Sequence, residues 1–306
     1  MVHQLLIDPN RPPKVLLLGN GILLLNKGIG WDDLLKKLCP DEKCMPDLTK
    51  IPAAMKPEAI CGTNVEETQT LIALNLRSQT PHELLKQLVF MDFDAVITTN
   101  YTYEIEDALF EGKWSEYKRK KCHTTLYGST QAKHNIFKCN LIKTKEGRTV
   151  PVFHVHGELA RKKSLILSYY SYAKSINLLV DMSKRRNNVY EEHQQTGKEL
   201  VCEGWLDYFI LGDVYALGFG FDLSEFDIWW ALERKNRENA NTGKMHAYMI
   251  SKQIENEKSV MLRAMGAEEK FISVKDDYDE AYINAIKQIK ESLTYHHMEP
   301  SDTHRC

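Results

Sequence analysis

Short, almost wholly apolar runs alternate with longer amphipathic segments along most of this chain. The runs Lys14–Leu18, Asp94–Thr98 and Val214–Leu217 each end in a polar or glycine-rich turn. Runs of this kind are typical of strands that are buried on both faces. Three further strands are predicted, over Val152–His156, Met245–Ile250 and Phe271–Ser273.

The segments between these runs carry apolar residues at helical spacing. Trp31–Leu38 is amphipathic and has two aspartates near its start, where the helix dipole favours them. The helical pattern over residues 66–90 breaks at Ser78–Glu83, where Thr80 is the expected N-cap and Pro81 the first helical residue. Further helices are predicted near Tyr103, over residues 170–210 with a break at Arg185–Asn188, over Ser224–Arg234 with Ser224 as its cap, and over Asp279–Leu293.

Strands that alternate with helices predict an α/β protein with a Rossmann-like parallel sheet flanked by helices. We expect a single domain over residues 1–295. It should contain a helical insertion, or small subdomain, over about residues 31–90 and a variable insertion over about residues 111–150. The polar end of the chain, residues 296–306, is expected to be a disordered tail.

Composition narrows the classes of function. Among the 306 residues, 40 are basic and 42 acidic, so the formal charge of −2 argues against a nucleic-acid-binding surface over the whole protein. Nucleic acid would be bound only indirectly or through a local patch such as Lys118–Lys121 or Lys184–Arg186, and both runs are equally compatible with plain solvated surface. No stretch approaches the ~18 apolar residues that span a bilayer, so no membrane contact is expected. Seven cysteines without a CxxC pair, and no export signal, predict reduced thiols and a cytoplasmic protein.

Three predicted strands end in turns that could hold a nucleotide: Gly19–Gly21, Thr98–Asn100 and Gly218–Gly220. In folds of this kind ligands lie beyond the carboxyl ends of the strands, at the switch point. The first turn would bring its backbone close to a pyrophosphate, with N–H groups free to bind it. It lacks the third glycine of GxGxxG, and a tight turn after a buried strand is the alternative interpretation.

Asn100 and two histidines are the side chains best suited to chemistry. The amide of Asn100 could hold a ribose hydroxyl or a water, or could simply cap the following turn. His154 and His156 are two apart on a predicted strand and should share one face. His156, at the strand end, could act as a general base, whereas His154 is expected to be a structural, hydrogen-bonded histidine. A metal site built on the pair lacks a third ligand, so no metal is expected.

Taken together, these motifs resemble the sirtuin fold, and specifically the sirtuin-like domains of bacterial antiphage NAD hydrolases. Thr98–Tyr101 is similar to the Thr-Thr-Asn-Tyr motif of that family, and His156-Gly157 is similar to its His-Gly motif. Gly19–Gly21 with Gly28–Leu34 resembles its glycine turn and the stretch that follows. Leu217–Asp222 resembles its late Gly-Phe-Ser turn. The order of the motifs holds from about residue 14 to residue 293.

The resemblance implies NAD as the substrate, with Asn100 and His156 as the catalytic residues. It also implies a set of residues that bind the dinucleotide: Gly19, Asn20, Gly21, Thr99, Tyr101, Gly218, Phe219, Gly220 and Asp222. Two positions depart from the family pattern. Leu23 stands in place of a serine, and Thr102 stands in place of an aspartate that helps to hold the nicotinamide amide.

Protein deacylases of the family carry CxxC…CxxC soon after the histidine. Here no cysteine lies between His156 and Cys202, so no zinc is expected, and hydrolysis is favoured over transfer to an acyl-lysine. We therefore expect an NAD hydrolase that cleaves the nicotinamide–ribose bond, as the effector of a prokaryotic antiphage defence system. It would be kept inactive until triggered or assembled, through homo-oligomerisation or a regulatory partner protein. The alternative is a catalytically silent module that binds NAD or an ADP-ribose derivative within a complex.

Overall fold

A seven-stranded sheet in the order β4-β5-β3-β2-β7-β8-β9 forms the centre of the computed structural model. The model describes residues 5–39, 46–114, 134–238, 243–252, 257–274 and 277–295. The strands are β2 (Lys14–Leu18), β3 (Ala95–Thr98), β4 (Asn140–Lys143), β5 (Thr149–His154), β7 (Asp213–Leu217), β8 (Met245–Ser251) and β9 (Glu268–Ser273). Within this sheet β4 pairs antiparallel with β5, and the other pairs are parallel. The predicted α/β fold with a mainly parallel sheet is confirmed.

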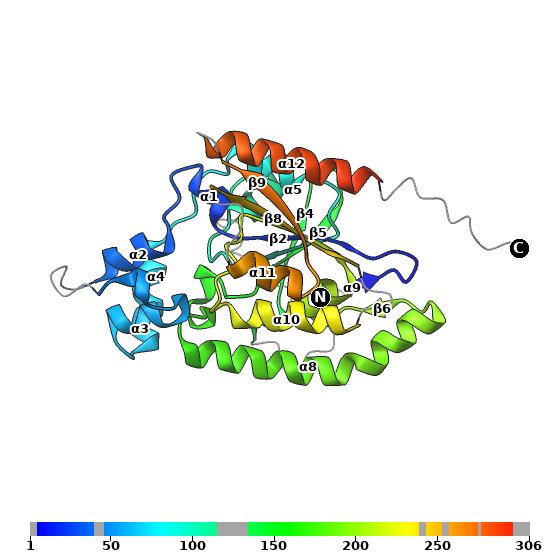
Figure 1. Cartoon of the computed structure of the whole chain (residues 1–306), viewed down its shortest axis with the longest axis horizontal. Coiled ribbons are helices and arrows are strands. Elements are labelled where there is room, and N and C mark those ends of the chain that lie inside the picture. The colour runs from blue at the N-terminus through cyan, green and yellow to red at the C-terminus, as the bar shows by residue number, and fades with distance from the viewer. Residues whose placement is uncertain are drawn as a thin grey trace, which may run out of the picture.

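Helices cover both faces of this sheet (Figure 1). In chain order they are α1 (Gly21–Leu24), α2 (Trp31–Leu38), α3 (Lys56–Cys61), α4 (Val65–Asn75), α5 (Glu83–Val89), α6 (Glu104–Phe110), α8 (Tyr169–Thr196), α9 (Trp205–Leu211), α10 (Phe226–Glu238), α11 (Glu257–Ala264) and α12 (Tyr278–Tyr295). A separate antiparallel pair joins β1 (Leu6–Ile7) to β6 (Leu200–Val201). None of the described helices combines the length and apolar character needed to cross a bilayer.

Side chains alternate across the sheet and build two cores. Along β2, Val15 and Leu17 belong to the core under α8, α9 and α10, whereas Leu16 and Leu18 belong to the core under α5, α6 and α12. All four side chains are fully buried. This is why the run Lys14–Leu18 is apolar at consecutive positions rather than at every second one.

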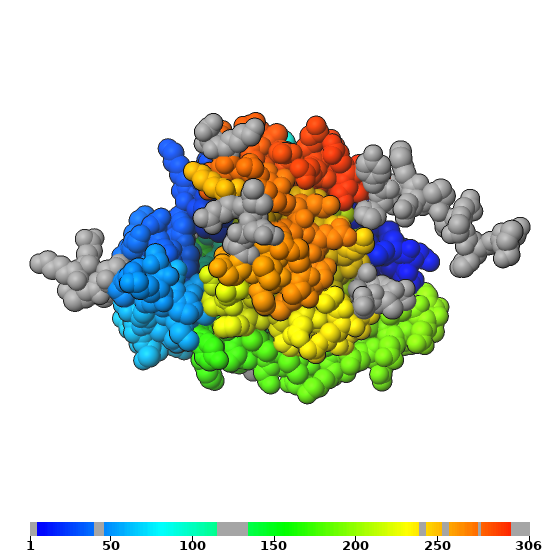
Figure 2. Space-filling model, viewed as in Figure 1, coloured from blue at the N-terminus to red at the C-terminus, as the bar shows by residue number. Residues whose placement is uncertain are grey.

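A small helical unit, made of α2, α3 and α4, stands at one end of the sheet and has a core of its own. In this core Leu34, Leu35 and Ile72 of the unit pack together with Leu165 and Leu167 of the main body. Figure 2 shows the unit, in blue, beside the body of the molecule. The helix that follows, α5, packs on the sheet instead, because its leucines belong to the core under α12.

The start of α5 differs from the prediction by two residues. The helix begins at Glu83 rather than Pro81, and its N-cap is His82 rather than Thr80. The His82 imidazole accepts a hydrogen bond from the backbone N–H of Leu84 at 3.3 Å. A histidine ring nitrogen therefore takes the capping role that the sequence suggested for a hydroxyl.

The predicted break at Arg185–Asn188 is wrong, because α8 runs unbroken from Tyr169 to Thr196. Arg186 is buried, and it binds both carboxylate oxygens of Asp207 in α9 at 3.0 Å. The polar run predicted a solvent-exposed break, but Arg186 instead forms a charged pair in the interior of the protein. The predicted tail 296–306 and the basic run Lys118–Lys121 lie outside the described residues.

Candidate active site

Turns from four neighbouring strands meet at one edge of the sheet. β2 lies between β3 and β7, and β3 is followed by β5, all in parallel. The chain leaves β2 towards β3 on one side and returns to β7 on the other, which makes this edge the switch point where ligands bind in such sheets. The sequence motifs singled out above lie in these turns.

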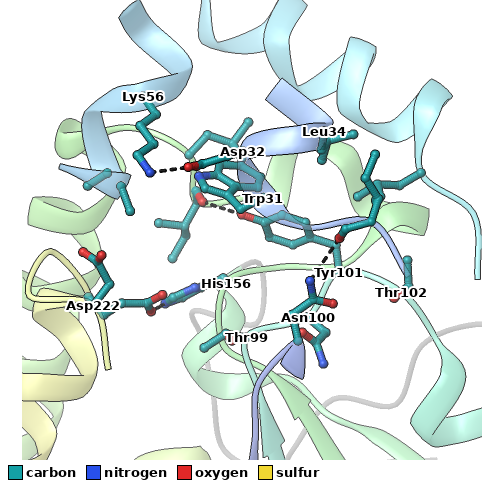
Figure 3. A pocket seen from close by; sticks show the side chains of 18 of the residues that line it. Trp31, Asp32, Leu34, Lys56, Thr99, Asn100, Tyr101, Thr102, His156 and Asp222 are labelled. Atoms are coloured by element: carbon teal, nitrogen blue, oxygen red, sulfur yellow. Dashed lines mark hydrogen bonds and ion pairs between the residues drawn. The ribbon is translucent and has the colours of Figure 1, made fainter. Parts of the chain in front are cut away.

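A cavity of about 310 Å³ opens at this edge, and we call it the central cavity. Asn100 and His156, which follow β3 and β5, both line it (Figure 3). Four more of the residues implied by the resemblance line it too: Asn20, Thr99, Tyr101 and Asp222. The small helical unit contributes the opposite wall, which includes Trp31, Asp32 and Lys56, and Lys56 pairs with Asp32 at 2.7 Å.

Asn100 is held from three directions. Its backbone N–H donates to Thr98 Oγ1 at 3.1 Å, and its Nδ2 donates to the backbone oxygen of Gly19 at 3.1 Å. Its own backbone oxygen accepts a hydrogen bond from His154 Nδ1 at 2.6 Å. Among the residues that the structure describes, the side-chain Oδ1 of Asn100 has no hydrogen-bond partner. The amide is therefore fixed in direction and retains an acceptor for a ligand.

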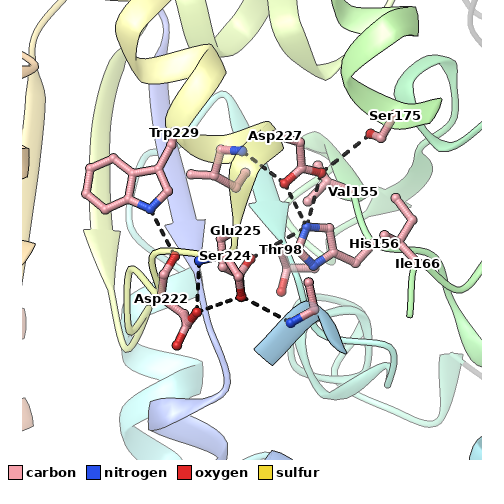
Figure 4. A network of polar contacts seen from close by, with 12 residues as sticks. Thr98, Val155, His156, Ile166, Ser175, Asp222, Ser224, Glu225, Asp227 and Trp229 are labelled. Atoms are coloured by element: carbon pink, nitrogen blue, oxygen red, sulfur yellow. Dashed lines mark hydrogen bonds and ion pairs between the residues drawn. The ribbon is translucent and has the colours of Figure 1, made fainter. Parts of the chain in front are cut away.

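His156 faces a pair of acidic side chains that the sequence analysis missed (Figure 4). Its Nε2 lies 3.2 Å from both carboxylate oxygens of Asp227 and 3.6 Å from Glu225. Burial lowers the pKa of His156, but the charges of Asp227 and Glu225 outweigh it and raise the pKa to about 9. At neutral pH the ring is thus mostly an imidazolium paired with Asp227.

Both acidic side chains are largely shielded from solvent. The Asp227 side chain is fully buried, and that of Glu225 is 19% exposed. Burial raises the pKa of Glu225 to about 7, partly opposed by the charge of His156. Both follow the Gly218–Gly220 turn closely, and two carboxylates so near a glycine-rich strand end are the signal that could have revealed them.

The ligand atoms of His156, Glu225 and Asp227 lie within 4.8 Å of one another. One imidazole and two carboxylates are a set that could hold a divalent cation. Without a cation, His156 Nε2 pairs with Asp227 at 3.2 Å, and Glu225 Oε2 lies 3.6 Å from the same nitrogen. The arrangement therefore supports proton chemistry by itself, and any test of activity needs an arm with a chelator.

Asp222 lines the central cavity, but its carboxylate is engaged locally. It accepts hydrogen bonds from the backbone N–H of Ser224 at 2.9 Å and from the Ser224 hydroxyl at 2.7 Å. Ser224 in turn accepts a hydrogen bond from the backbone of Ala54 in the small helical unit at 3.1 Å. The prediction that Ser224 caps the following helix is wrong, since α10 begins at Phe226.

Tyr101, in the cavity wall, contacts both the main body of the fold and the small helical unit. Its hydroxyl donates to the backbone oxygen of Ile166 at 3.0 Å, and its ring meets that of Trp31 edge-on at 6.1 Å. Thr102 also lines the central cavity, so a hydroxyl stands where the resemblance leads one to expect a carboxylate.

A second cavity of about 660 Å³ lies on the β7 and β8 side of β2. It is lined by four other residues implied by the resemblance: Gly21, Gly218, Phe219 and Gly220. Tyr248, Ser251, Lys258 and Tyr282 also line it. Gly19 lines neither cavity.

The glycine turn does not offer the free N–H groups that the sequence suggested. The N–H of Gly19 donates to Leu217 O at 3.3 Å, and that of Gly21 donates to Gly218 O at 2.8 Å. A Cβ on Gly19 would lie 2.4 Å from Gly218 O. The glycines are thus required because the turns after β2 and β7 pack directly against each other.

His154 and His156 do not share a face, contrary to the prediction. β5 ends at His154, and the chain turns before Gly157, whose φ is +95°. His154 therefore contacts Glu106 of α6 at 2.6 Å, whereas His156 contacts Asp227 of α10. The two histidines belong to separate polar networks.

Comparison with known protein families agrees with this geometry. A family model described as SIR2-like domain matches residues 94–269, which is more than half of the chain. The matched region contains Asn100, His156, Glu225 and Asp227. No curated protein matches the chain significantly.

Proposed function

The chain belongs to the SIR2-like domain family, and from that premise we propose that it is an NAD hydrolase that cleaves the bond between nicotinamide and ribose. SIR2-like domains use NAD as a substrate. The observation that carries the proposal is the meeting of Asn100 and His156 in one cavity at the switch point of the sheet.

The two cavities divide the dinucleotide between them. The nicotinamide and its ribose would occupy the central cavity, and the adenosine half would occupy the second cavity against Gly218–Gly220. Consecutive residues support this placement, since Asn20 lines the first cavity and Gly21 the second. The pyrophosphate would then cross the turn after β2 at Asn20 and Gly21, the two residues of that turn that line the cavities.

The chemistry follows from the groups around the ribose. The bond from C1′ to the nicotinamide nitrogen breaks, its electron pair leaves with neutral nicotinamide, and positive charge develops on the ribose. Asp227 and Glu225 place negative charge near that ribose. Asn100 Oδ1 orients a ribose hydroxyl or the attacking water. Neutral His156, with Nε2–H donating to Asp227, accepts the proton of that water at Nδ1, a role worth about 10²–10⁴ in rate. The products are nicotinamide, ADP-ribose and a proton.

A resting enzyme of this design is restrained at neutral pH. The pKa of about 9 keeps most of His156 protonated, and a protonated ring cannot accept a proton. This fits the effector of an antiphage defence system that acts in the cytoplasm and is activated by homo-oligomerisation or by a partner protein. Activation would then need to lower the pKa of His156 or move Asp227 away from it.

A catalytically silent module that binds NAD or an ADP-ribose derivative is the second candidate. Thr102 favours it, because a hydroxyl in the cavity wall holds the nicotinamide amide less firmly than a carboxylate would. In that case the same two cavities would bind the dinucleotide without turnover.

Incubation of the purified chain with NAD at pH 9, where about half of His156 is neutral, followed by chromatography of nicotinamide and ADP-ribose, tests the proposal. We expect nicotinamide release that survives a chelator and is lost in Asn100→Ala and His156→Ala. Because His156→Ala leaves the Asp227 carboxylate buried without its partner, His156→Ala with Asp227→Asn is made as well. His193→Ala, a histidine in α8 bonded to Lys198 O, serves as the matched control. Saturable NAD binding by calorimetry without nicotinamide release at pH 9 would instead establish the silent module.

A further inference from the structure

A buried polar network lies directly behind Asn100, on the side away from the central cavity. It comprises His154 at the end of β5, Glu106 in α6, Asn140 in β4 and Glu158 after β5. Each of these four residues is at most 4% exposed. Burying charged side chains this deeply costs free energy unless they are paired and hydrogen-bonded. Such a network is therefore a candidate for a role beyond packing.

The hydrogen bonds of His154 define its protonation. Nδ1 lies 2.6 Å from the backbone oxygen of Asn100, and Nε2 lies 2.6 Å from Glu106 Oε1. A backbone oxygen can only accept a hydrogen bond. Glu106 Oε1 already accepts one from Asn140 Nδ2 at 2.7 Å. Nδ1 must therefore donate to the Asn100 carbonyl, and beside an ionised Glu106 carboxylate Nε2 donates as well, in the imidazolium form.

The charges around His154 favour that form. Burial lowers the pKa of His154, but Glu106 and, from further away, Glu158 outweigh it, so that the pKa is raised above its ordinary value. Glu158 is itself paired with Arg161 at 2.6 Å. Of the titratable groups that the structure describes, Tyr103 also lies against the His154 ring. The two rings meet edge-on, with their centroids 5.6 Å apart.

We propose that His154 is a positioning residue for Asn100: its Nδ1–H, with the ring anchored by Glu106, holds the backbone carbonyl of Asn100 and so aims the Asn100 amide into the central cavity. That carbonyl belongs to the peptide that joins Asn100 to Tyr101, and both residues line the cavity. The assignment rests on the proposed function, because it gives the asparagine a reaction to serve. It differs from a structural role in packing, which would not depend on the proton at Nδ1.

Two substitutions separate the hydrogen bond from the packing. In His154→Asn combined with Glu106→Gln the side-chain amide nitrogen takes the place of Nδ1 and can still donate to the Asn100 carbonyl, and no lone carboxylate is buried. In His154→Phe combined with Glu106→Gln the ring shape is kept and no lone carboxylate is buried, but the donor is lost. His246→Phe is the matched control, because His246 is a ring of similar burial stacked on Tyr215.

Nicotinamide release is measured for each variant as kcat and KM. We expect the phenylalanine variant to lose about 10²-fold in kcat with little change in KM, and the asparagine variant to regain most of it. The control should keep the activity of the unmodified protein. Equal kcat in the unmodified protein and the phenylalanine variant would overturn the assignment.

Nitrogen-15 NMR of the unmodified chain and the phenylalanine variant tests the same point without any turnover. Nδ1 of His154 should carry a proton at pH 7.5, and the backbone amide signal of Tyr101 should move when the Nδ1–H is lost in His154→Phe combined with Glu106→Gln. An unprotonated Nδ1 at pH 7.5, or a Tyr101 amide signal that is the same in both proteins, would refute the positioning role. A chain that releases no nicotinamide but shows both NMR results would refute the proposed hydrolase and leave the His154–Asn100 link standing.

Discussion

Asp227→Asn changes the charge beside His156 while keeping its shape. Asp227 Oδ1 accepts a hydrogen bond from the backbone N–H of Ile228 at 2.9 Å, and an asparagine oxygen can do the same. The same oxygen lies 3.2 Å from His156 Nε2, so an asparagine oxygen can also accept the Nε2–H and leave Nδ1 of the neutral ring free to take a proton. The substitution therefore removes the strongest influence that raises the pKa of His156, and Glu225 remains at 3.6 Å.

The size of the effect follows from the populations of the neutral ring. With a pKa of about 9, about 3% of His156 is neutral at pH 7.5. At the ordinary pKa of about 6.5, about 90% would be neutral. The less basic ring accepts a proton less readily, so we expect the rate of the variant above pH 9 to fall roughly tenfold. At pH 7.5 the larger neutral fraction offsets that loss.

The assay is kcat/KM for nicotinamide release between pH 6 and pH 10. The unmodified chain should gain activity up to about pH 9, and Asp227→Asn should level off one to two pH units earlier. Glu225→Gln should shift the profile less, because Glu225 is farther from the ring and partly exposed. Coincident profiles for the unmodified chain and Asp227→Asn would show that this carboxylate does not control the base.

The same variant has a signature in stability. The pKa of His156 is raised in the folded protein, so its pairing stabilises the fold fully below pH 6.5, and this contribution is lost as the pH rises through 9. A shift to about 9 corresponds to at most about 3 kcal/mol in the free energy of unfolding. The free energy of unfolding, measured by urea denaturation, should fall more between pH 6 and pH 9.5 in the unmodified chain than in Asp227→Asn. A parallel loss in both would contradict the pairing.

Two further predictions concern the scaffold. Gly157→Ala should destabilise the fold by about 3 kcal/mol or more, because φ is +95° and a Cβ would lie 2.3 Å from Ser164 O; Gly147→Ala, at φ +85° with open space around it, should cost only about 1 kcal/mol. Equal urea midpoints for the two would rule out the close contact as the cause. Asp207→Asn should cost about 3–5 kcal/mol in the same assay, since it leaves the buried Arg186 charge unpaired, and a loss below 1 kcal/mol would contradict that pairing.

The central strands of the sheet could be predicted because burial on both faces leaves a direct trace in the sequence, whereas the partly exposed β4 was not predicted. Lys14–Leu18 and Asp213–Leu217 pair along their whole length, and both are buried at each position. The predicted helix boundaries were wrong where a residue far away in the sequence determines the local structure. The polar residues around Arg186 predict an exposed break, but Asp207 binds Arg186 from another helix and keeps α8 continuous.

The candidate site was predictable as far as it consists of short motifs. Asn100 and His156 follow strand ends, and the topology brings their side chains into one cavity. Asp227 is 71 positions from His156 in the chain, and nothing in its local sequence indicates which ring it would meet. The prediction of free N–H groups at Gly19 and Gly21 was wrong for a similar reason. Both groups donate hydrogen bonds to carbonyls at the end of β7, far away in the sequence.

The two histidines show how such distant partners could be found from sequence. The strand ends at His154, so the chain can turn and send His156 towards the opposite side of the sheet. Each ring then meets a carboxylate on a helix that follows another strand: Glu106 after β3 and Asp227 after β7. A His-x-His strand end therefore predicts two acidic positions, one in each of those helices. Of the two pairs, only the one at the cavity can exchange its proton with a substrate, so a loss of its carboxylate should change the pH profile while a loss of the other should change the placement of Asn100.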